Sequence, residues 1–303
     1  MSKVSSVLIL GTLPPPIGGV TISVKNLFVA LKSKVKVNVF PTGLWTRYDI
    51  VHAHNYAPWK RFAMLVLGKI LARKNVFTIH GMHFKENLWF NRLNLWLTDG
   101  VVIQNNNVLE FAPTLKKKPL LKIGSLVKEG IVTSANSQKI LGPKTKPRVL
   151  IYAQHAGQYE GEDIYGVQFV LDLLGQIQQD FTIVLVDVAN AYPNLKSHAQ
   201  EQLVHLDKPL DFTQLLTEVD IYIRPTSKDG DSVAVLEAIM LGVPVLASNV
   251  TERRQEVLLY EYGNKESFLS ALKQINLSEL KTKNTNLPSV EDYLRFYQEL
   301  LDN

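Results

Sequence analysis

Short apolar runs alternate with longer stretches of helical periodicity through the first half of the chain. The runs place Val, Ile and Leu on consecutive positions, as expected for parallel strands that are buried on both faces. Between them, apolar residues recur every three or four positions, which indicates helices. The pattern predicts strands over 4–11, 34–41, 48–55, 75–81 and 100–105, and helices over 19–33 and 59–74.

The second half repeats this alternation after a polar stretch at 132–147. Its predicted strands cover 148–154, 181–188, 202–206, 220–226 and 243–248, and its predicted helices cover 166–178 and 232–241. Two doubly wound α/β domains are the simplest account of a pattern that occurs twice. We expect Rossmann-like domains over 1–140 and 141–285, and an amphipathic helix within 286–303 that packs back on the first domain.

Composition is that of an ordinary globular protein. Hydrophobic residues make up 46% and charged residues 20% of the 303 positions, enough for a core in each domain. The absence of cysteine excludes disulfides and thiolate metal sites. The first apolar run is too short for a signal peptide, and no run of about 18 apolar residues predicts a membrane-spanning helix. We therefore expect a cytoplasmic protein.

Charge is divided unevenly between the two halves. The chain has 33 Lys and Arg against 28 Asp and Glu. Through residue 135 there are 18 basic and 5 acidic residues, a net +13, which leaves 33 − 18 = 15 basic and 28 − 5 = 23 acidic residues, a net −8. Such a basic half is typical of contact with nucleic acid, an anionic membrane or a phosphorylated substrate, although it can also serve solubility alone.

One stretch, residues 224–248, combines a strand, a loop and a helix with two acids eight positions apart. The loop "SKDG" follows the strand, Ser232 can cap the helix, and Gly242 suits the helix end. A helix that begins at the carboxyl edge of a parallel sheet directs its free amides at the ligand site, where they stabilise phosphate. Asp229 precedes this helix and Glu237 lies inside it, so we expect a diphosphate between the two acids.

The stretch reads D-G-D-S-V-A-V-L-E-A-I-M-L-G-V-P-V and resembles the acid-x7-acid motif of the family 4 retaining glycosyltransferases of GT-B fold. "LPPPIGGVTISVKNLFVAL" is similar to that family's glycine-rich first loop and helix, "YDIVHAHN" to its third-strand segment, and "FTIHG" to its strand ending in a histidine. The likeness covers nearly the whole chain in order. It implies two Rossmann-like domains that face a central cleft, and transfer of a sugar with retention from a nucleotide diphosphate sugar to an acceptor hydroxyl.

The resemblance also implies roles for individual residues. It places Glu237 on the ribose hydroxyls, Asp229 on a sugar hydroxyl and His80 near the reacting sugar. Gly18 and Gly19 fall beside the diphosphate, although both glycines can instead serve a tight turn and His80 can be a structural histidine. The other residues expected around the donor are Gly230, Asp231, Ser232, Val233 and Ala234.

The chain departs from this family where the leaving diphosphate is neutralised. The family has a G-R-x-x-x-x-K-G pattern after the first strand of its second domain, whereas "YAQHAGQYEGEDIYG" contains no Lys or Arg. Three acids occupy the loop instead, namely Glu160, Glu162 and Asp163. Arg224 and Lys228 are the nearest basic residues that can take over the catalytic role of the cation, and Arg224 can equally be structural.

We expect neither a metal ion nor a redox cofactor. The D-x-D at 229–231 is typical of metal-dependent transferases of the other large glycosyltransferase fold, but the helix after "DGDS" and the repeated domain disfavour that assignment. The pairs His52 with His54 and His80 with His83 have no evident third ligand for zinc. No G-x-G-x-x-G follows the first strand, which disfavours dinucleotide redox chemistry.

Aromatic and basic residues alternate in two segments of the first half, 57–74 and 85–97. This mixture suits an anionic lipid surface, although part of each segment must be core. The basic residues of the first segment are Lys60, Arg61, Lys69, Arg73 and Lys74.

The predicted partners follow from the resemblance and from the charge. They are a UDP- or GDP-linked sugar donor, a glycan or lipid-linked acceptor and an anionic membrane surface, with no nucleic acid. The predicted location is peripheral, at the inner face of the cell membrane, in surface polysaccharide biosynthesis. Two rival functions remain: a nucleotide-sugar epimerase of related fold, and a catalytically silent subunit that binds sugar nucleotides.

Overall fold

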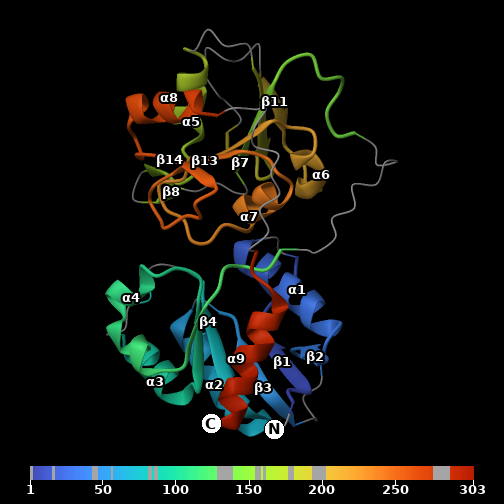
Figure 1. Ribbon diagram of the computed structural model, residues 1–303, viewed down its shortest axis with the longest axis vertical. Helices are drawn as coiled ribbons and strands as arrows, with labels where there is room; N and C mark the ends of the chain where they lie inside the picture. The colour runs from blue at the N-terminus through green and yellow to red at the C-terminus, as the bar shows by residue number, and fades with distance from the viewer. Residues whose placement is uncertain are drawn as a thin grey trace. The chain divides into compact units, whose positions relative to one another are not determined.

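The chain divides into two compact units, each with its own parallel sheet (Figure 1). The first unit comprises Met1–Glu129, Gly230–Val233 and Leu287–Asn303, and the second comprises Gly130–Asp229 and Ala234–Asn286. The first unit is therefore built from three separate parts of the chain. The computed structural model describes residues 3–15, 18–42, 47–55, 57–80, 84, 88–127, 139–153, 158–159, 162–176, 181–192, 203–275 and 287–303.

Six parallel strands form the sheet of the first unit in the order β2-β1-β3-β4-β5-β6. The strand β1 pairs with β2 on one side and with β3 on the other, so the order of the chain reverses at β1. Consecutive apolar residues form these strands because helices cover both faces of the sheet. The strands are β1 (Ser6–Leu10), β2 (Lys36–Val39), β3 (Tyr48–Ala53), β4 (Ala72–Ile79), β5 (Gly100–Ile103) and β6 (Leu120–Lys122).

Two sets of helices cover this sheet. One face packs against α1 (Gly19–Lys32) and α9 (Val290–Asp302), and in Figure 1 α9 is the red helix in front of the blue strands β1 and β3. The other face packs against α2 (Pro58–Leu71), α3 (Trp89–Leu97), the short helix α4 (Val108–Phe111) and the 3-10 helix η1 (Pro113–Lys117). Apolar side chains of α1 and α9 form the core on their face of the sheet, as the periodicity of these two helices predicts.

The helix α9 approaches the sheet most closely at Gly100, the first residue of β5. A Cβ atom at this position would lie 2.8 Å from Cδ1 of Leu300 and 2.8 Å from Cζ of Phe296. Tyr297 is fully buried, and its hydroxyl lies 2.6 Å from Nδ1 of His52 on β3. The last helix of the chain is thus part of the core of the first unit.

The second unit has six parallel strands in the order β11-β10-β7-β12-β13-β14. The strand β7 pairs with both β10 and β12, so the order reverses there, as in a Rossmann sheet. A two-stranded antiparallel ribbon joins β8 (Gln158–Tyr159) and β9 (Glu162–Asp163). The parallel strands are β7 (Arg148–Ala153), β10 (Thr182–Asp187), β11 (Leu203–Leu206), β12 (Ile221–Arg224), β13 (Val245–Ser248) and β14 (Val257–Tyr260).

Helices also cover both faces of the second sheet. One core contains α5 (Val167–Leu174) and α8 (Lys265–Lys273), packed on the side of Val149, Ile151 and Ile223. The other core contains α6 (Phe212–Leu216) and most of α7 (Val233–Met240). Asp211 caps α6 by accepting hydrogen bonds from the backbone N–H groups of Thr213 and Gln214.

The α/β fold class and the predicted strands are confirmed, with one correction at the end of the helix predicted over 59–74. The helix α2 ends at Leu71, and residues 72–74 already belong to β4. In the parallel ladder Ala72 pairs with Tyr48, and Lys74 pairs with Ile50, so strand pairing overrides the helical pattern. The sequence pattern also missed β6, β14 and α8.

None of the helices in the described part of the chain is long and apolar enough to cross a bilayer. Residues 132–138 of the polar stretch lie outside the described residues, as do His83 and Glu160.

Candidate functional site

The loop between β12 and α7 lies at the switch point of the second sheet. The connections from β7 and β12 leave in opposite directions, and ligands of open α/β sheets bind beside such a point at the carboxyl ends of the strands. The strand β12 ends at Arg224, and α7 begins at Val233. Every predicted donor residue except His80, Gly18 and Gly19 lies on this loop or on α7.

Asp229 is held by two arginines. Its Oδ2 accepts a hydrogen bond from Nε of Arg224 at 2.9 Å, and its Oδ1 accepts one from Nη2 of the same residue at 3.0 Å. Nη2 of Arg253 donates to Oδ2 at 2.7 Å. The three side chains are 14%, 3% and 8% exposed for Arg224, Arg253 and Asp229 respectively, so these are ion pairs of low solvent access.

The electrostatics of this cluster follow from its composition. Burial alone would raise the pKa of Asp229, but the guanidinium groups of Arg224 and Arg253 outweigh it and lower that pKa to about 2. The carboxylate of Asp229 is the main reason that the pKa of Arg224 lies above its ordinary value, against an opposing effect of burial. At neutral pH two positive groups face one negative group, which leaves one net positive charge. The Arg224 guanidinium also lies 5.7 Å from the ring centre of Tyr165.

Sequence reasoning missed Arg253. The residue lies between β13 and β14, beyond the carboxyl end of β13, which is the strand next to β12. The signal that could have found it was the rule already applied to Arg224: carboxyl ends of neighbouring parallel strands meet at one edge of the sheet. Lys228, the other predicted cation, is half-buried on the same loop.

Glu237 lies on α7 and is half-buried. Burial, together with the negative charge of Asp211, raises the pKa of its carboxyl group to about 7. Among the residues that the structure describes, none is recorded as donating a hydrogen bond to this carboxylate. A carboxyl group with a pKa this high is poised to gain from a ligand that donates hydrogen bonds to it.

The beginning of α7 and the residues before it group with the first unit. Asp231 Oδ2 accepts a hydrogen bond from the backbone N–H of Ser125 at 2.6 Å. A Cβ atom on Gly230 would lie 3.0 Å from the carbonyl oxygen of His80. A narrow crevice at this point is lined by His80, Gln104, Asn105, Gly230 and Asp231, together with Ile79 and Val108. Ser232 immediately precedes Val233 and Ala234, the first two residues of α7.

The two carboxylates of the D-x-D at 229–231 have different partners. Asp229 pairs with two guanidinium groups, and Asp231 accepts from a backbone amide. Within the described residues, no group of three or more His, Asp or Glu side chains is arranged to hold a metal ion.

His80 follows β4 and belongs to a cluster of histidines. Its Nε2 lies 3.0 Å from Nδ1 of His54, a residue that is 3% exposed. Burial is the main cause that lowers the pKa of His80 to about 4, opposed by a hydrogen bond with Gln104. His80 is therefore neutral at pH 7, and it can donate or accept a hydrogen bond but cannot serve as a cation.

His52 is the structural member of the cluster. Its Nδ1 lies 2.6 Å from the hydroxyl of Tyr297, and its Nε2 lies 2.7 Å from the hydroxyl of Thr78. Burial lowers its pKa to about 3, so it is a neutral link between β3, β4 and α9. The ring of His54 contacts the His52 ring in a tilted arrangement, with an interplanar angle of 39° and a centroid distance of 4.2 Å.

Gly18 and Gly19 begin α1. Gly18 has φ −168° and ψ 160°, an extended conformation that any residue can adopt, and Gly19 does not have a positive φ. Neither position therefore requires glycine for a turn. A Cβ atom on Gly19 would meet no atom of the described residues within 4 Å, and one on Gly18 would meet only Oγ1 of Thr21 at 3.7 Å. The lack of side chains leaves the first amides of α1 accessible.

The acidic loop before α5 has a structural task. Asp163 accepts hydrogen bonds from the backbone N–H groups of Tyr165 and Val167, at 2.9 and 3.0 Å, and from the hydroxyl of Tyr192. Gly166 has φ +57°, and a side chain there would collide with the carbonyl oxygen of Pro225. This loop therefore packs against the start of the β12–α7 loop, and Glu162 lies beside Asp163 on β9.

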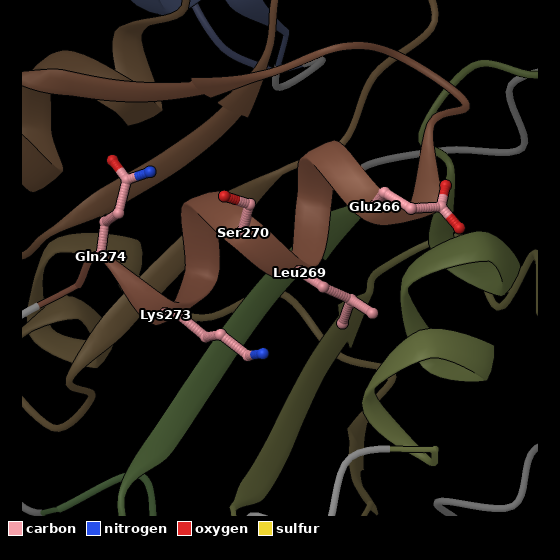
Figure 2. A pocket seen from close by; sticks show the side chains of 5 residues that line it. All are labelled: Glu266, Leu269, Ser270, Lys273 and Gln274. Atoms are coloured by element: carbon pink, nitrogen blue, oxygen red, sulfur yellow. The ribbon is translucent and has the colours of Figure 1, made fainter.

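A hollow of about 520 Å³ lies elsewhere on the second unit, along one face of α8. Figure 2 shows Glu266, Leu269, Ser270, Lys273 and Gln274 spread along that helix. Their polar ends point in different directions and do not converge on a common point. The hollow is wide open and lacks the convergent polar groups of a small-molecule site.

Residues 152–276, which include Asp229 and Glu237, match the model of a family described as glycosyl transferases group 1. The O-antigen biosynthesis glycosyltransferase WclY of Escherichia coli is 24% identical over 234 residues, which cover 67% of this chain and 62% of that protein. The chain thus spans about three-fifths of the length of the curated relatives it matches. The matched segment contains the cluster of Asp229, Arg224 and Arg253 described above.

Solved structures share the fold over nearly the whole chain. The catalytic domain of starch synthase IV from Arabidopsis thaliana, bound to ADP and acarbose, aligns with a TM-score of 0.67 at 11% identity and full coverage of both chains. Anabaena HepE in complex with UDP aligns with a TM-score of 0.65 at 13% identity, over 98% of each chain. A lipopolysaccharide outer core galactosyltransferase, WaaB, aligns with a TM-score of 0.64 at 11% identity, over 98% of this chain and 99% of its own. The chain therefore has the GT-B fold.

Proposed function

We propose that the protein is a glycosyltransferase that moves a sugar from a nucleotide diphosphate sugar to an acceptor hydroxyl. The observation that carries the proposal is the buried cluster of Asp229, Arg224 and Arg253, which lies at a sheet edge inside the segment that matches glycosyl transferases group 1. One net positive charge at that edge suits a diphosphate group.

The proposed donor is UDP- or GDP-linked. In this proposal Glu237 accepts hydrogen bonds from the ribose hydroxyls, and the diphosphate lies at the amides of Ser232, Val233 and Ala234. HepE binds UDP in its solved structures and starch synthase IV binds ADP, which supports a nucleotide diphosphate. Gly18 and Gly19 supply further amides at the start of α1.

The chemical step breaks the bond between the anomeric carbon and the diphosphate oxygen. The acceptor oxygen forms the new bond to that carbon, and its proton passes to the departing diphosphate. Negative charge grows on the leaving oxygen, and fixed positive groups lower the barrier by several kcal/mol. Arg224, Arg253 and Lys228 are the candidates for this charge, and Asp229 orients the two arginines.

Two residues orient the sugar in this proposal. The Asp229 carboxylate accepts three hydrogen bonds from guanidinium groups, which fix its orientation, and in this proposal it lies beside a sugar hydroxyl. His80 is held by His54 and presents a neutral ring. Retention of the anomeric configuration is also part of the proposal and rests on the resemblance of the acid-x7-acid segment.

The proposed acceptor is a glycan, in particular a lipid-linked one, in surface polysaccharide synthesis. The names of WclY, an O-antigen biosynthesis glycosyltransferase, and of WaaB and WaaG, which are lipopolysaccharide enzymes, support this class. An enzyme that acts on such acceptors works at the inner face of the cell membrane, where a basic first half is attracted to anionic lipid.

The experiment that tests the proposal combines a thermal-shift screen with a turnover assay. Nucleotide diphosphates and their sugars are screened first, because a ligand raises the unfolding temperature according to its affinity. The stabilising donors are then incubated with and without glycan acceptors. Release of nucleoside diphosphate that depends on an acceptor supports the proposal. Epimerised sugar without an acceptor, or binding with no turnover, contradicts it.

A further inference from the structure

Helices α2 and α3 pack side by side on the first unit and present large apolar side chains to solvent. On α2, Trp59 is 57% exposed and Ile70 is 73% exposed. On α3, Trp89 is 70% exposed and Trp96 is 77% exposed. Single exposed apolar residues are normal, but a group of this size on two adjacent helices marks an interaction surface.

Polar side chains occupy the buried side of the same helices. Asn91 and Asn94 on α3 are 2% and 0% exposed, and Arg61 on α2 is 3% exposed. Nη2 of Arg61 donates to Oδ1 of Asn91 at 2.6 Å, and Nδ2 of Asn94 donates to the carbonyl oxygen of Pro58 at 3.1 Å. On α3, the amphipathic pattern is thus partly reversed: asparagines face the protein while tryptophans face solvent.

Arg61 was expected to contribute to a basic surface, and this expectation is wrong because its side chain is buried. Its guanidinium lies 4.8 Å from the ring centre of Phe77 and 5.1 Å from that of Phe84, inside the unit. Burial lowers its pKa to about 10, so it still carries its charge at neutral pH. Its hydrogen bond to Asn91 joins α2 to α3 on the buried side, whereas the tryptophans lie on the outer faces of both helices.

The exposed residues lie at helical spacing along each outer face. Trp59, Val66 and Ile70 follow one stripe of α2, while Trp89, Arg92 and Trp96 follow one stripe of α3. Residues 58–71 and 89–97 contain no Asp or Glu. We refer to the following residues as the α2–α3 face: Trp59, Lys60, Val66, Lys69, Ile70, Trp89, Arg92 and Trp96.

The charged members of this face are basic. Lys60 and Arg92 are exposed, and Nζ of Lys60 lies 5.5 Å from the ring centre of Trp59. Lys69 forms an ion pair with Asp99, with 3.0 Å between Nζ and Oδ2. Arg73 lies just beyond α2 and pairs with Asp49 at 3.5 Å. Within the described residues, the exposed tryptophans thus lie on the same helices as the exposed cations Lys60 and Arg92.

We propose that the α2–α3 face docks on the headgroup region of an anionic bilayer. Tryptophan favours the boundary between headgroups and acyl chains, because its ring is apolar and its N–H is polar. The cations beside it attract anionic headgroups. Both helices are short and lie on the surface of a folded unit, so this face would rest in the headgroup region.

The charge of the α2–α3 face disfavours a second copy of this chain as its partner. A second copy of this chain would bring two basic faces together, which costs energy unless acids intervene, and the two helices carry none. Single-stranded nucleic acid also combines stacking on aromatic rings with cations, so it is included in the test as a competing outcome.

The test uses the full chain and sedimentation with vesicles of phosphatidylcholine alone or mixed with phosphatidylglycerol. Trp59→Ser with Trp96→Ser removes the apolar contribution, and Lys60→Gln with Arg92→Gln removes the charge. The matched control for charge is Lys116→Gln with Lys117→Gln, since both lysines are exposed on η1. The matched control for apolar area is Leu259→Ser, which replaces a 45% exposed leucine of the second unit.

Binding is expected on the mixed vesicles and not on the neutral ones, with release at high salt. Each lysine or arginine near an anionic surface contributes roughly a fivefold change in partitioning, so the Lys60 and Arg92 variant should bind at least tenfold more weakly. The tryptophan variant should lose at least as much, whereas both controls should bind like the unchanged protein. Equal loss in the controls, or equal binding to neutral vesicles, overturns the proposal. So does tight binding of a single-stranded oligonucleotide by a protein that ignores vesicles.

This inference deepens the proposed function by naming the surface through which the enzyme would reach a lipid-linked acceptor. The same variants are assayed for transfer to a water-soluble acceptor, and kcat/KM is expected to stay unchanged, because none of the mutated residues belongs to the candidate site. Absence of transfer in every variant would contradict the proposed function while leaving the vesicle result valid. If the unchanged protein does not bind the vesicles, only the proposal of a docking surface is contradicted.

Discussion

The Asp229 carboxylate is bound through both of its oxygens by arginines that follow two neighbouring strands. Its place before a helix at a sheet edge indicated a ligand-binding acid, and Arg224 was expected nearby as a cation. The structure adds that the two side chains bind each other through both carboxylate oxygens, and that Arg253 joins them. This pairing depends on the β12–β13 register, which places the loop after each strand next to the other, and no sequence spacing encodes that contact.

Replacement of Arg253 by Met should lower both stability and turnover. Arg224 still neutralises Asp229 in this variant, so the loss of stability at pH 7 should be about 1 to 3 kcal/mol, less than for an unpaired buried charge. Because the pKa of Asp229 is lowered to about 2, its contribution is present above about pH 4 and disappears as pH falls through 2. Urea unfolding of both proteins should therefore show the difference shrinking over that range. A difference that stays constant from pH 7 to pH 2 would separate Arg253 from Asp229.

Substitutions of the three basic residues test which of them stabilises the leaving diphosphate. Met at Arg224 or Arg253, and Ala at Lys228, should each lower kcat more than they weaken donor binding wherever the side chain stabilises the leaving diphosphate. The expected loss is about a hundredfold for the residue that carries the role. Lys265→Ala on α8 is a matched control, because it removes an exposed lysine of the same unit. Full activity in all three variants would show that no cation of this loop takes part.

Because the pKa of Glu237 is raised, we expect donor binding to depend on pH. Its carboxyl group has a pKa of about 7, and its ionised form accepts stronger hydrogen bonds from ribose hydroxyls than the protonated form does. The dissociation constant of the donor should fall about tenfold per pH unit up to pH 7 and level off above it, as measured by titration calorimetry. Binding near pH 6.5 should also release a proton. Glu237→Gln should abolish this dependence and weaken binding at pH 8 by about 2 to 4 kcal/mol.

The same substitution should stabilise the protein without ligand at high pH. An acid whose pKa rises on folding, here from 4.5 to about 7, makes folding less favourable once pH exceeds 4.5. The cost grows until pH 7 and is constant above it. Glu237→Gln should therefore exceed the unchanged protein in free energy of unfolding by about 2 kcal/mol at pH 8 and equal it at pH 4. A variant that is less stable at pH 8 would show that the carboxylate has a favourable partner.

At the scale of elements, the sequence pattern predicted the central strands well and the peripheral elements poorly. Strands such as β1 and β10 contain four consecutive apolar residues, as expected where both faces of the sheet are covered. The edge strands β6 and β14 are short and partly exposed, so their residues lack a distinctive pattern. The helix α3 was missed as well, because its exposed tryptophans and buried asparagines reverse the usual relation between polarity and burial.

The contact of α9 with β5 gives a prediction for Gly100. Gly100→Val would place side-chain atoms against Leu300 and Phe296, which already lie 2.8 Å from the position of a Cβ atom. Overpacking of this kind costs about 1 to 3 kcal/mol, and urea unfolding should show it. Gly142→Ala is the control, since a Cβ there would meet no described atom within 4 Å, and its free energy of unfolding should change by less than about 0.5 kcal/mol. Equal effects of both substitutions would show that α9 does not rest on β5.

At the scale of the whole molecule, the order of the chain and the division into units do not coincide. The chain leaves the first unit near residue 130, contributes Gly230–Val233 to it, and returns to it at Leu287. The last helix thus completes the core of the unit formed first. Its amphipathic pattern predicted that it would pack on a domain surface. Its contacts with β1 and β3 are long-range in sequence, and they could not be read from local periodicity.

Removal of residues 287–303 should therefore destabilise the first unit while leaving the second intact. Six side chains of α9 are buried, and each large apolar one contributes about 1.5 to 3 kcal/mol. Hydrogen exchange should increase in β1 and β3 and stay unchanged in β7 and β10. Phe296→Ala, a milder change, should lower protection in the same strands, whereas Arg295→Ala, at a 70% exposed side chain, should have no effect. If β7 and β10 lose protection together with β1 and β3, the two units unfold as one, because local loss of core would then spread through the whole chain.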